Sequence, residues 1–119
     1  IDHHAALIYT MVLVSAADRD MTDAEMRTIG EIVQYLPVFD DFEFDNLPKI
    51  AADCAEMLDS DDGLEQTIEV IVGSLPDQLR ETAYAVACDV AAADGSVKQE
   101  EMRLLEMLRY GLNVDRLTA

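Results

Sequence analysis

The stretch AADRDMTDAEMR at residues 16–27 returns as AADGSVKQEEMR at residues 92–103. Both copies begin Ala-Ala-Asp and end Glu-Met-Arg, with the first aspartate and the last glutamate seven positions apart. Each copy follows a run rich in Ala and Val and leads into a run rich in Glu, Met, Ile or Leu, a composition that favours helix. The repeat therefore predicts one structural unit, two helices joined by a short acidic loop, that the chain uses twice.

Helical patterns extend over the rest of the chain. Glycine (5) and proline (3) are scarce among the 119 residues, which argues against a loop-rich or all-β fold. We expect an all-α fold: a single multi-helical bundle of about six to eight helices over residues 1–119. It would contain two helical hairpins, repeats over residues 5–36 and 81–112, related by a pseudo-two-fold axis and joined by two central helices.

The expected helices follow from hydrophobic periodicity and from breaker residues. They cover residues 4–17, 22–36, 47–58, 64–74, 76–93 and 97–110. Pro76 is expected to open the fifth helix and Gly111 to end the sixth. Residues 113–119 have the pattern of a further helix that the end of the chain cuts short.

Acidic residues dominate the charge, because 25 Asp and Glu against 8 Lys and Arg give a net charge of −17. This balance excludes binding to nucleic-acid phosphates, which needs clustered Lys and Arg, and it opposes electrostatic docking to an anionic membrane. Bound cations would relieve the self-repulsion, although a solvated acidic surface accounts for most of these side chains. The longest apolar stretch, residues 5–17, is too short for a transmembrane segment. Peripheral membrane association, a protein partner and the oligomeric state stay open.

Helical periodicity places one glutamate of each copy on an apolar face. The stripes are Met21, Glu25, Ile29 and Ile32 in the first copy, and Val97, Glu101, Leu105 and Leu108 in the second. A carboxylate that faces a core must be paired, hydrogen-bonded or bound to metal, because burying an isolated charge costs several kcal/mol. Glu25 and Glu101 are therefore the most informative acids of the repeat.

The aspartates of the repeat follow the ends of the first and fifth helices, where the helix dipole disfavours negative charge. A bound cation would offset that cost, and the candidate ligands are Asp18, Asp20, Glu25, Asp94 and Glu101. Oxygen donors without His or Cys nearby favour Ca²⁺ or Mg²⁺ over zinc. The loop that begins at Asp18 is not an EF-hand, because Asp23 stands where that loop needs glycine.

Helix capping and salt bridges are the competing interpretation of the same acids. Thr22 and Glu25 fit a capping box, in which the glutamate accepts a hydrogen bond from a backbone amide. Lys98 stands at the position equivalent to Thr22, so that a capping box leaves Glu101 unexplained. Nearby arginines could also pair with the acids, the candidates being Arg19, Arg27 and Arg103. Both interpretations stay open.

The remaining side chains offer no catalytic pattern, since no Ser or Cys has a His/Asp partner pattern and no glycine-rich phosphate loop occurs. Cys54 and Cys88 lie in apolar helical stretches and are expected to be buried free thiols. His3 and His4 are expected to be exposed rather than to act as ligands. The three phenylalanines of residues 39–44 either cap the core or form an edge that binds a partner.

The doubled Ala-Ala-Asp motif with its downstream glutamate resembles the TerB-like tellurite-resistance domain, and so do Leu-Pro-Val-Phe at 36–39 and Leu-Arg-Tyr-Gly-Leu at 108–112. The resemblance covers nearly the whole chain. It implies an all-helical bundle with a divalent-cation site, usually proposed for calcium, whose acidic residues would be Asp18, Glu25, Asp94 and Glu101. Two positions depart from the family pattern: Arg19 replaces the usual glycine and Lys98 replaces the usual Ser or Thr.

The resemblance also implies a cytoplasmic protein, in some members at the inner face of the cell membrane, with links to tellurite resistance and general chemical stress. It implies no particular enzymatic activity. The leading prediction is therefore a non-enzymatic acidic domain that binds Ca²⁺ or Mg²⁺. A protein-interaction or co-chaperone-associated module is the alternative, and a metal-dependent hydrolase ranks third.

Overall fold

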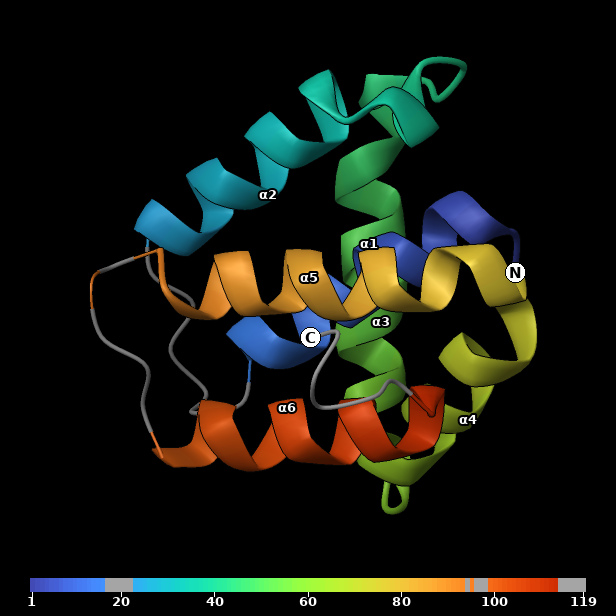
Figure 1. Ribbon diagram of the computed structural model, residues 1–119, viewed down its shortest axis with the longest axis vertical. Coiled ribbons are helices and arrows are strands. Elements are labelled where there is room, and N and C mark those ends of the chain that lie inside the picture. Colours follow the sequence, from blue (N-terminus) through green and yellow to red (C-terminus); the bar gives the residue numbers. More distant parts are fainter. Residues whose placement is uncertain (17–22, 94, 96–98, 114–119) are drawn as a thin grey trace.

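Helices account for all regular secondary structure in the described part of the protein. The structure is a computed structural model that describes residues 1–16, 23–93, 95 and 99–113. The α-helices are α1 (His3–Ser15), α2 (Asp23–Tyr35), α3 (Leu47–Leu58), α4 (Gly63–Ser74), α5 (Arg80–Ala91) and α6 (Gln99–Leu112). Three short 3₁₀ turns are η1 (Pro37–Phe39), η2 (Phe44–Asn46) and η3 (Asp77–Leu79). Since these residues contain no strand, the prediction of an all-α bundle is confirmed (Figure 1).

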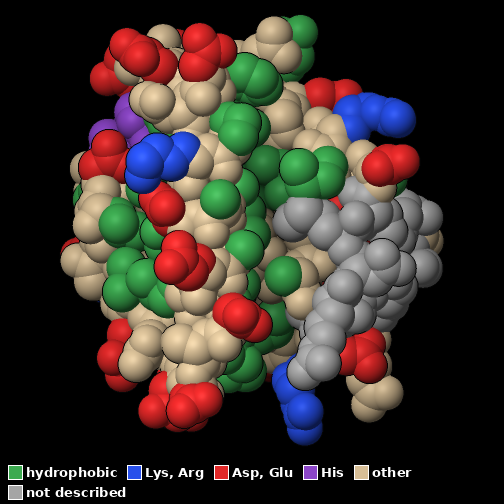
Figure 2. Space-filling view, turned by 180° about the vertical axis from the view of Figure 1, so that it is seen from behind, with side chains coloured by type: hydrophobic (Ala, Val, Ile, Leu, Met, Phe, Trp, Pro, Cys, Tyr) green, Lys and Arg blue, Asp and Glu red, His purple; other side chains and the backbone are tan. Residues whose placement is uncertain are grey.

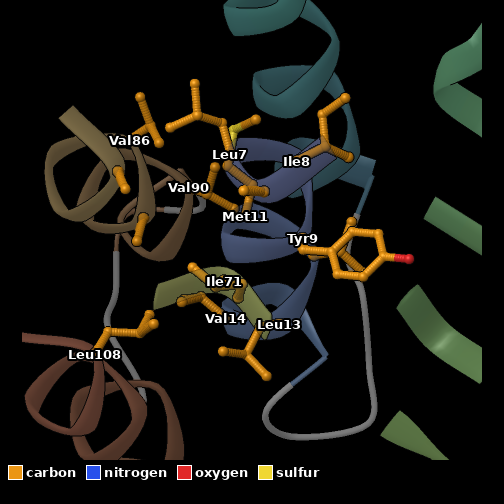
Figure 3. Close-up of a cluster of buried hydrophobic side chains, with 14 of the residues drawn as sticks. Leu7, Ile8, Tyr9, Met11, Leu13, Val14, Ile71, Val86, Val90 and Leu108 are labelled. Carbon is orange, nitrogen blue, oxygen red and sulfur yellow. The ribbon is translucent and has the colours of Figure 1, made fainter. Parts of the chain in front are cut away.

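Helix α1 is the centre of the bundle. Residues 4–15 are all buried, which requires a helix that is apolar on every side rather than along one stripe. The helix contacts each of the other five α-helices. Figure 3 shows its side chains in the core, where Met11 and Val14 lie among residues of three other helices: Val90 of α5, Ile71 of α4 and Leu108 of α6.

The described helices include two pairs that correspond to the two copies of the repeat. Helices α1 and α2 contact each other, α5 and α6 contact each other, and the first members of the two pairs, α1 and α5, pack together. Helices α3 and α4 also pack on α1 and on each other. The whole fits within about 32 × 30 × 30 Å. A two-fold relation between the pairs stays a prediction.

Two expected helix boundaries were wrong. Gly111 does not end α6, which continues to Leu112 and is followed by Asn113 at φ 57°. Asparagine adopts this left-handed conformation more readily than most residues, and it therefore takes the terminating role expected of glycine. Pro76 does not open α5 directly, because it precedes the 3₁₀ turn η3 and the α-helix begins at Arg80.

The expectation of exposed N-terminal histidines was wrong for His4. The residue is only 6% exposed, and its Nε2 lies 2.7 Å from the carbonyl oxygen of Val38 and 3.3 Å from a carboxylate oxygen of Asp41. The ring also stacks on Phe39 at 5.4 Å between centroids and meets Phe42 edge-on at 5.3 Å. Burial of His4 therefore comes from η1 and the residues just after it, which fold back over the start of α1.

The aromatic segment accordingly serves the core rather than an open edge. Phe39 is 3% exposed and belongs to the core, and Phe42 packs against it. Phe44, at 48% exposed, is the only one of the three phenylalanines that presents a large surface to solvent. The interpretation of this segment as a core cap is confirmed for Phe39 and Phe42.

Candidate functional site

The two repeat glutamates are buried, as their helical phase predicted. Glu25 is 2% exposed in the first turn of α2, and Glu101 is 1% exposed in the first turn of α6. Each lies on the face that its helix buries, together with Ile29 on α2 and with Leu104 and Leu108 on α6. Hydrophobic side chains three, four or seven positions along the helix thus fix the direction of each carboxylate.

Position at the start of a helix favours a negative charge, because unpaired backbone N–H groups and the helix dipole make that end positive. Each of the two carboxylates also has an interaction within the folded chain. In Figure 1 the starts of α2 and α6 and the ends of α1 and α5 all lie toward the left of the view. The two acidic helix starts are therefore at one end of the bundle.

Three of the five predicted ligands, Asp18, Asp20 and Asp94, lie outside the described residues. Within the described ranges, no three His, Cys, Asp or Glu side chains gather closely enough to hold a metal ion. A site that uses both glutamates would therefore need the aspartates of the two loops. The ligand set and the identity of the ion stay predictions.

Within the described residues, Glu25 and Glu101 form no salt bridge with Arg27 or Arg103. Arg27 and Arg103 are exposed, and neither forms an ion pair with any described residue. The reason is geometric, since residues two positions apart point to different faces of a helix. Arg19 and the capping partner Thr22 lie outside the described residues.

The two cysteines lack the properties of nucleophiles. Both are free thiols; Cys54 is fully buried, whereas Cys88 is only half-buried and not buried as expected. Burial raises the pKa of the Cys54 thiol to about 12, and its Sγ lies 3.7 Å from the carbonyl oxygen of Tyr9. Burial also raises the pKa of Cys88. Both groups are therefore protonated at neutral pH, whereas a reactive cysteine needs its thiolate.

A groove that the sequence did not indicate lies beside α6. Its volume is about 1020 Å³, and its walls come from the end of α1, the end of α3, the turn into α4 with the start of that helix, and residues 100–107 of α6. Its apolar surface includes Leu13, Leu58, Leu64, Leu104 and Met107. Because these residues belong to four separate segments, no local pattern reveals that they meet. The only feature of the sequence that could have pointed to this groove is the clustering of acidic residues at the end of α3 and at the start of α6.

Comparison with known proteins identifies the family. The family model described as "Tellurite resistance protein TerB" matches residues 4–118, nearly the whole chain. Searches of curated proteins and of solved structures gave no match. None of the described helices combines the length and the apolar character needed to cross a membrane. Taken with the doubled acidic motif and the all-helical bundle, the match shows that the chain belongs to the TerB family of tellurite resistance proteins.

Proposed function

We propose that this chain is a non-enzymatic TerB domain that binds a divalent cation, Ca²⁺ or Mg²⁺, through its duplicated acidic motif. The ligands would be Asp18, Asp20, Glu25, Asp94 and Glu101. The observation that carries the proposal is the near-complete burial of Glu25 and Glu101 at matching positions of two helices. A role in tellurite resistance and chemical stress, and a location in the cytoplasm, belong to the same proposal and rest on the family.

The energetic argument concerns charge in a dry environment. A carboxylate removed from water loses hydration worth several kcal/mol, and hydrogen bonds at a helix start return only part of it. A bound divalent ion offsets more of this lost hydration free energy, because the attraction between the cation and the carboxylate is strong at the low effective dielectric of a partly buried site. Carboxylate oxygens are also the donors that Ca²⁺ and Mg²⁺ prefer.

The overall charge supports the same conclusion. At −17 the chain repels itself in the compact state, and a bound cation removes two units of that charge at one point. The raised pKa values of Cys54 and Cys88 argue against thiol catalysis. Cation binding would therefore act by stabilising the folded state.

Thermal unfolding with and without metal tests the proposal. After chelator treatment, Ca²⁺ or Mg²⁺ should raise the melting temperature, because a ligand that binds only the folded state stabilises it by about 2.7 kcal/mol at a hundredfold excess over Kd. Glu101→Gln and Asp94→Asn should each remove most of the rise. Calorimetric titration of the same variants gives the affinity directly.

Two exposed glutamates provide matched controls, since Glu31→Gln on α2 and Glu100→Gln on α6 remove the same charge from the same helices. Both controls should keep the full metal response. No thermal shift and no heat of binding at millimolar metal would refute the proposal. An equal loss of response in Glu100→Gln and Glu101→Gln would reduce it to diffuse counterion binding.

A further inference from the structure

The groove beside α6 has an acidic rim. Its charged side chains are four carboxylates and a single cation, namely Glu56, Asp59, Asp61, Glu100 and Arg103. None of the five forms a salt bridge with another described residue. The rim is therefore net negative, and its charges are available to a partner.

Helix ends add to the negative potential of the groove. Helix α1 ends beside it, with Ala16 as the C-cap, and α3 ends beside it, with Asp59 as the C-cap. Neither helix has a basic residue in its last turn. Helix C-termini carry about half a negative charge and are normally neutralised by Lys, Arg or His. Glu56 and Asp59 instead place more negative charge where the helix dipole already disfavours it.

The floor of the groove is apolar and can be reached from outside. Leu58, Leu64 and Met107 are only partly buried, although all three pack against the core. Figure 2 shows a face of the molecule on which acidic side chains are spread over the surface with hydrophobic side chains exposed between them. A hollow of about 1020 Å³ with an apolar floor and a charged rim is typical of a recognition site.

We propose that this groove binds a basic amphipathic helix of a partner protein. The apolar face of that helix would cover Leu58, Leu64 and Met107, and its Lys and Arg side chains would meet Glu56 and Asp59. Helix-in-groove binding fits walls that are themselves helices, whereas the described residues have no sheet edge to which a strand could add. The partner helix would be basic, because its Lys and Arg side chains would complement the negative charge of the four carboxylates and of the two helix C-termini.

A second groove, farther along α6, supplies a matched control, and Met107 lines both grooves. It is smaller, about 500 Å³, and lies between α4 and α6 with Glu65 and Glu69 on its rim. Glu56→Lys with Asp59→Lys and Glu65→Lys with Glu69→Lys change the net charge equally. All four side chains are exposed, so both double variants are expected to fold, and thermal melting checks that they do. Lysines at the end of α3 are also favoured by its dipole.

The test uses a fluorescein-labelled model peptide of about 14 residues, with Leu on one helical face and Lys on the other. Its fluorescence anisotropy is titrated with the whole chain in chelator, so that the result does not depend on metal. We expect the wild-type protein to bind the peptide saturably. The Kd should be at least about tenfold higher for the Glu56→Lys, Asp59→Lys double variant, and it should stay within about twofold of the wild-type value for the Glu65→Lys, Glu69→Lys double variant. Backbone amide NMR shifts should change mainly at residues 55–64 and 100–107.

Three results would overturn the proposal. The first is absence of saturable binding at millimolar protein. The second is equal binding of a peptide with the same composition but scattered leucines, which would show that no apolar groove is engaged. The third is equal weakening by the two double variants, which would show that only the net charge of the domain attracts the peptide.

Discussion

At the scale of single residues, Cys54 links burial to the pH dependence of stability. Its folded pKa is about 12 against an ordinary value of 9.0, and the physical cause is desolvation. In the unfolded chain the thiol ionises near its ordinary pKa of 9.0. The contribution of the protonated thiol to the free energy of unfolding is therefore fully present below pH 9, and it is lost as the pH rises from there through 12. Burial also raises the pKa values of Tyr9, Tyr84 and Cys88, and these groups act in the same direction.

We predict that raising the pH from 8 to about 10.5 lowers the free energy of unfolding, with about 2 kcal/mol of the loss due to Cys54. Urea unfolding of wild type and Cys54→Ala at both pH values measures that share. The variant will be less stable at pH 8 because it loses buried volume, but its pH-induced loss should be smaller. An identical pH-induced loss in both proteins would contradict the prediction.

The burial of a residue could be predicted where it follows from the periodicity of its own helix. It could not be predicted where it depends on contact with a segment that is distant in the sequence. The phase of α2 and α6 placed Glu25 and Glu101 on buried faces, because Ile29 and Leu108 lie on the same side of each helix. His4 was missed because its burial depends on Phe39, which lies 35 positions away in the sequence. Only the folded chain brings that pair together.

At the scale of secondary-structure elements, the turn from α3 into α4 depends on Gly63. A Cβ at this position would clash with the backbone carbonyl oxygen of Met57 and would lie 2.6 Å from that of Leu58. These are backbone atoms of a helix end, which cannot move aside without disturbing α3. Gly30 in the middle of α2 differs, because a Cβ there has no neighbouring atom within 4 Å.

We predict opposite effects of the same substitution at these two glycines. Gly63→Ala should destabilise the protein by more than about 1 kcal/mol, because its backbone cannot accept a Cβ without strain. Gly30→Ala should stabilise it by about 0.5–1 kcal/mol, because alanine loses less backbone entropy in a helix. Urea unfolding of both variants at neutral pH provides the comparison. Effects of the same sign would show that the close approach at Gly63 does not constrain the turn.

Most elements could be predicted from periodicity and breaker residues, whereas some of their ends could not. The end of α6 was missed because Gly111 and Asn113 can each terminate a helix, and Gly111 instead lies in the last turn near Ile68 and Val72 of α4. Contact with another helix thus decided which residue ended α6. The groove beside α6 was missed for the same reason, since four segments build it.

At the scale of the whole molecule, the dominant feature is charge. The net charge of −17 is confined to a body about 32 Å across. At an ionic strength of about 0.01 M the Debye length is about 30 Å, so that nearly every pair of acids repels across the fold. At about 1 M it is about 3 Å, and only immediate neighbours interact. The few surface ion pairs in the described part, such as Lys49 with Asp53 at 3.0 Å, contribute little by comparison.

We predict that sodium chloride stabilises this protein. Raising the salt from about 0.01 M to about 1 M should increase the melting temperature by at least about 5 °C, equivalent to about 1 kcal/mol for a domain of this size. Magnesium or calcium chloride at equal ionic strength then separates screening from binding: extra stabilisation that Glu101→Gln removes belongs to the site, and the remainder belongs to screening. A melting temperature that falls with sodium chloride would mean that attractive ion pairs outweigh the repulsion among the acids. In that case relief of self-repulsion could no longer support the cation-binding proposal, which would rest on the two buried glutamates alone.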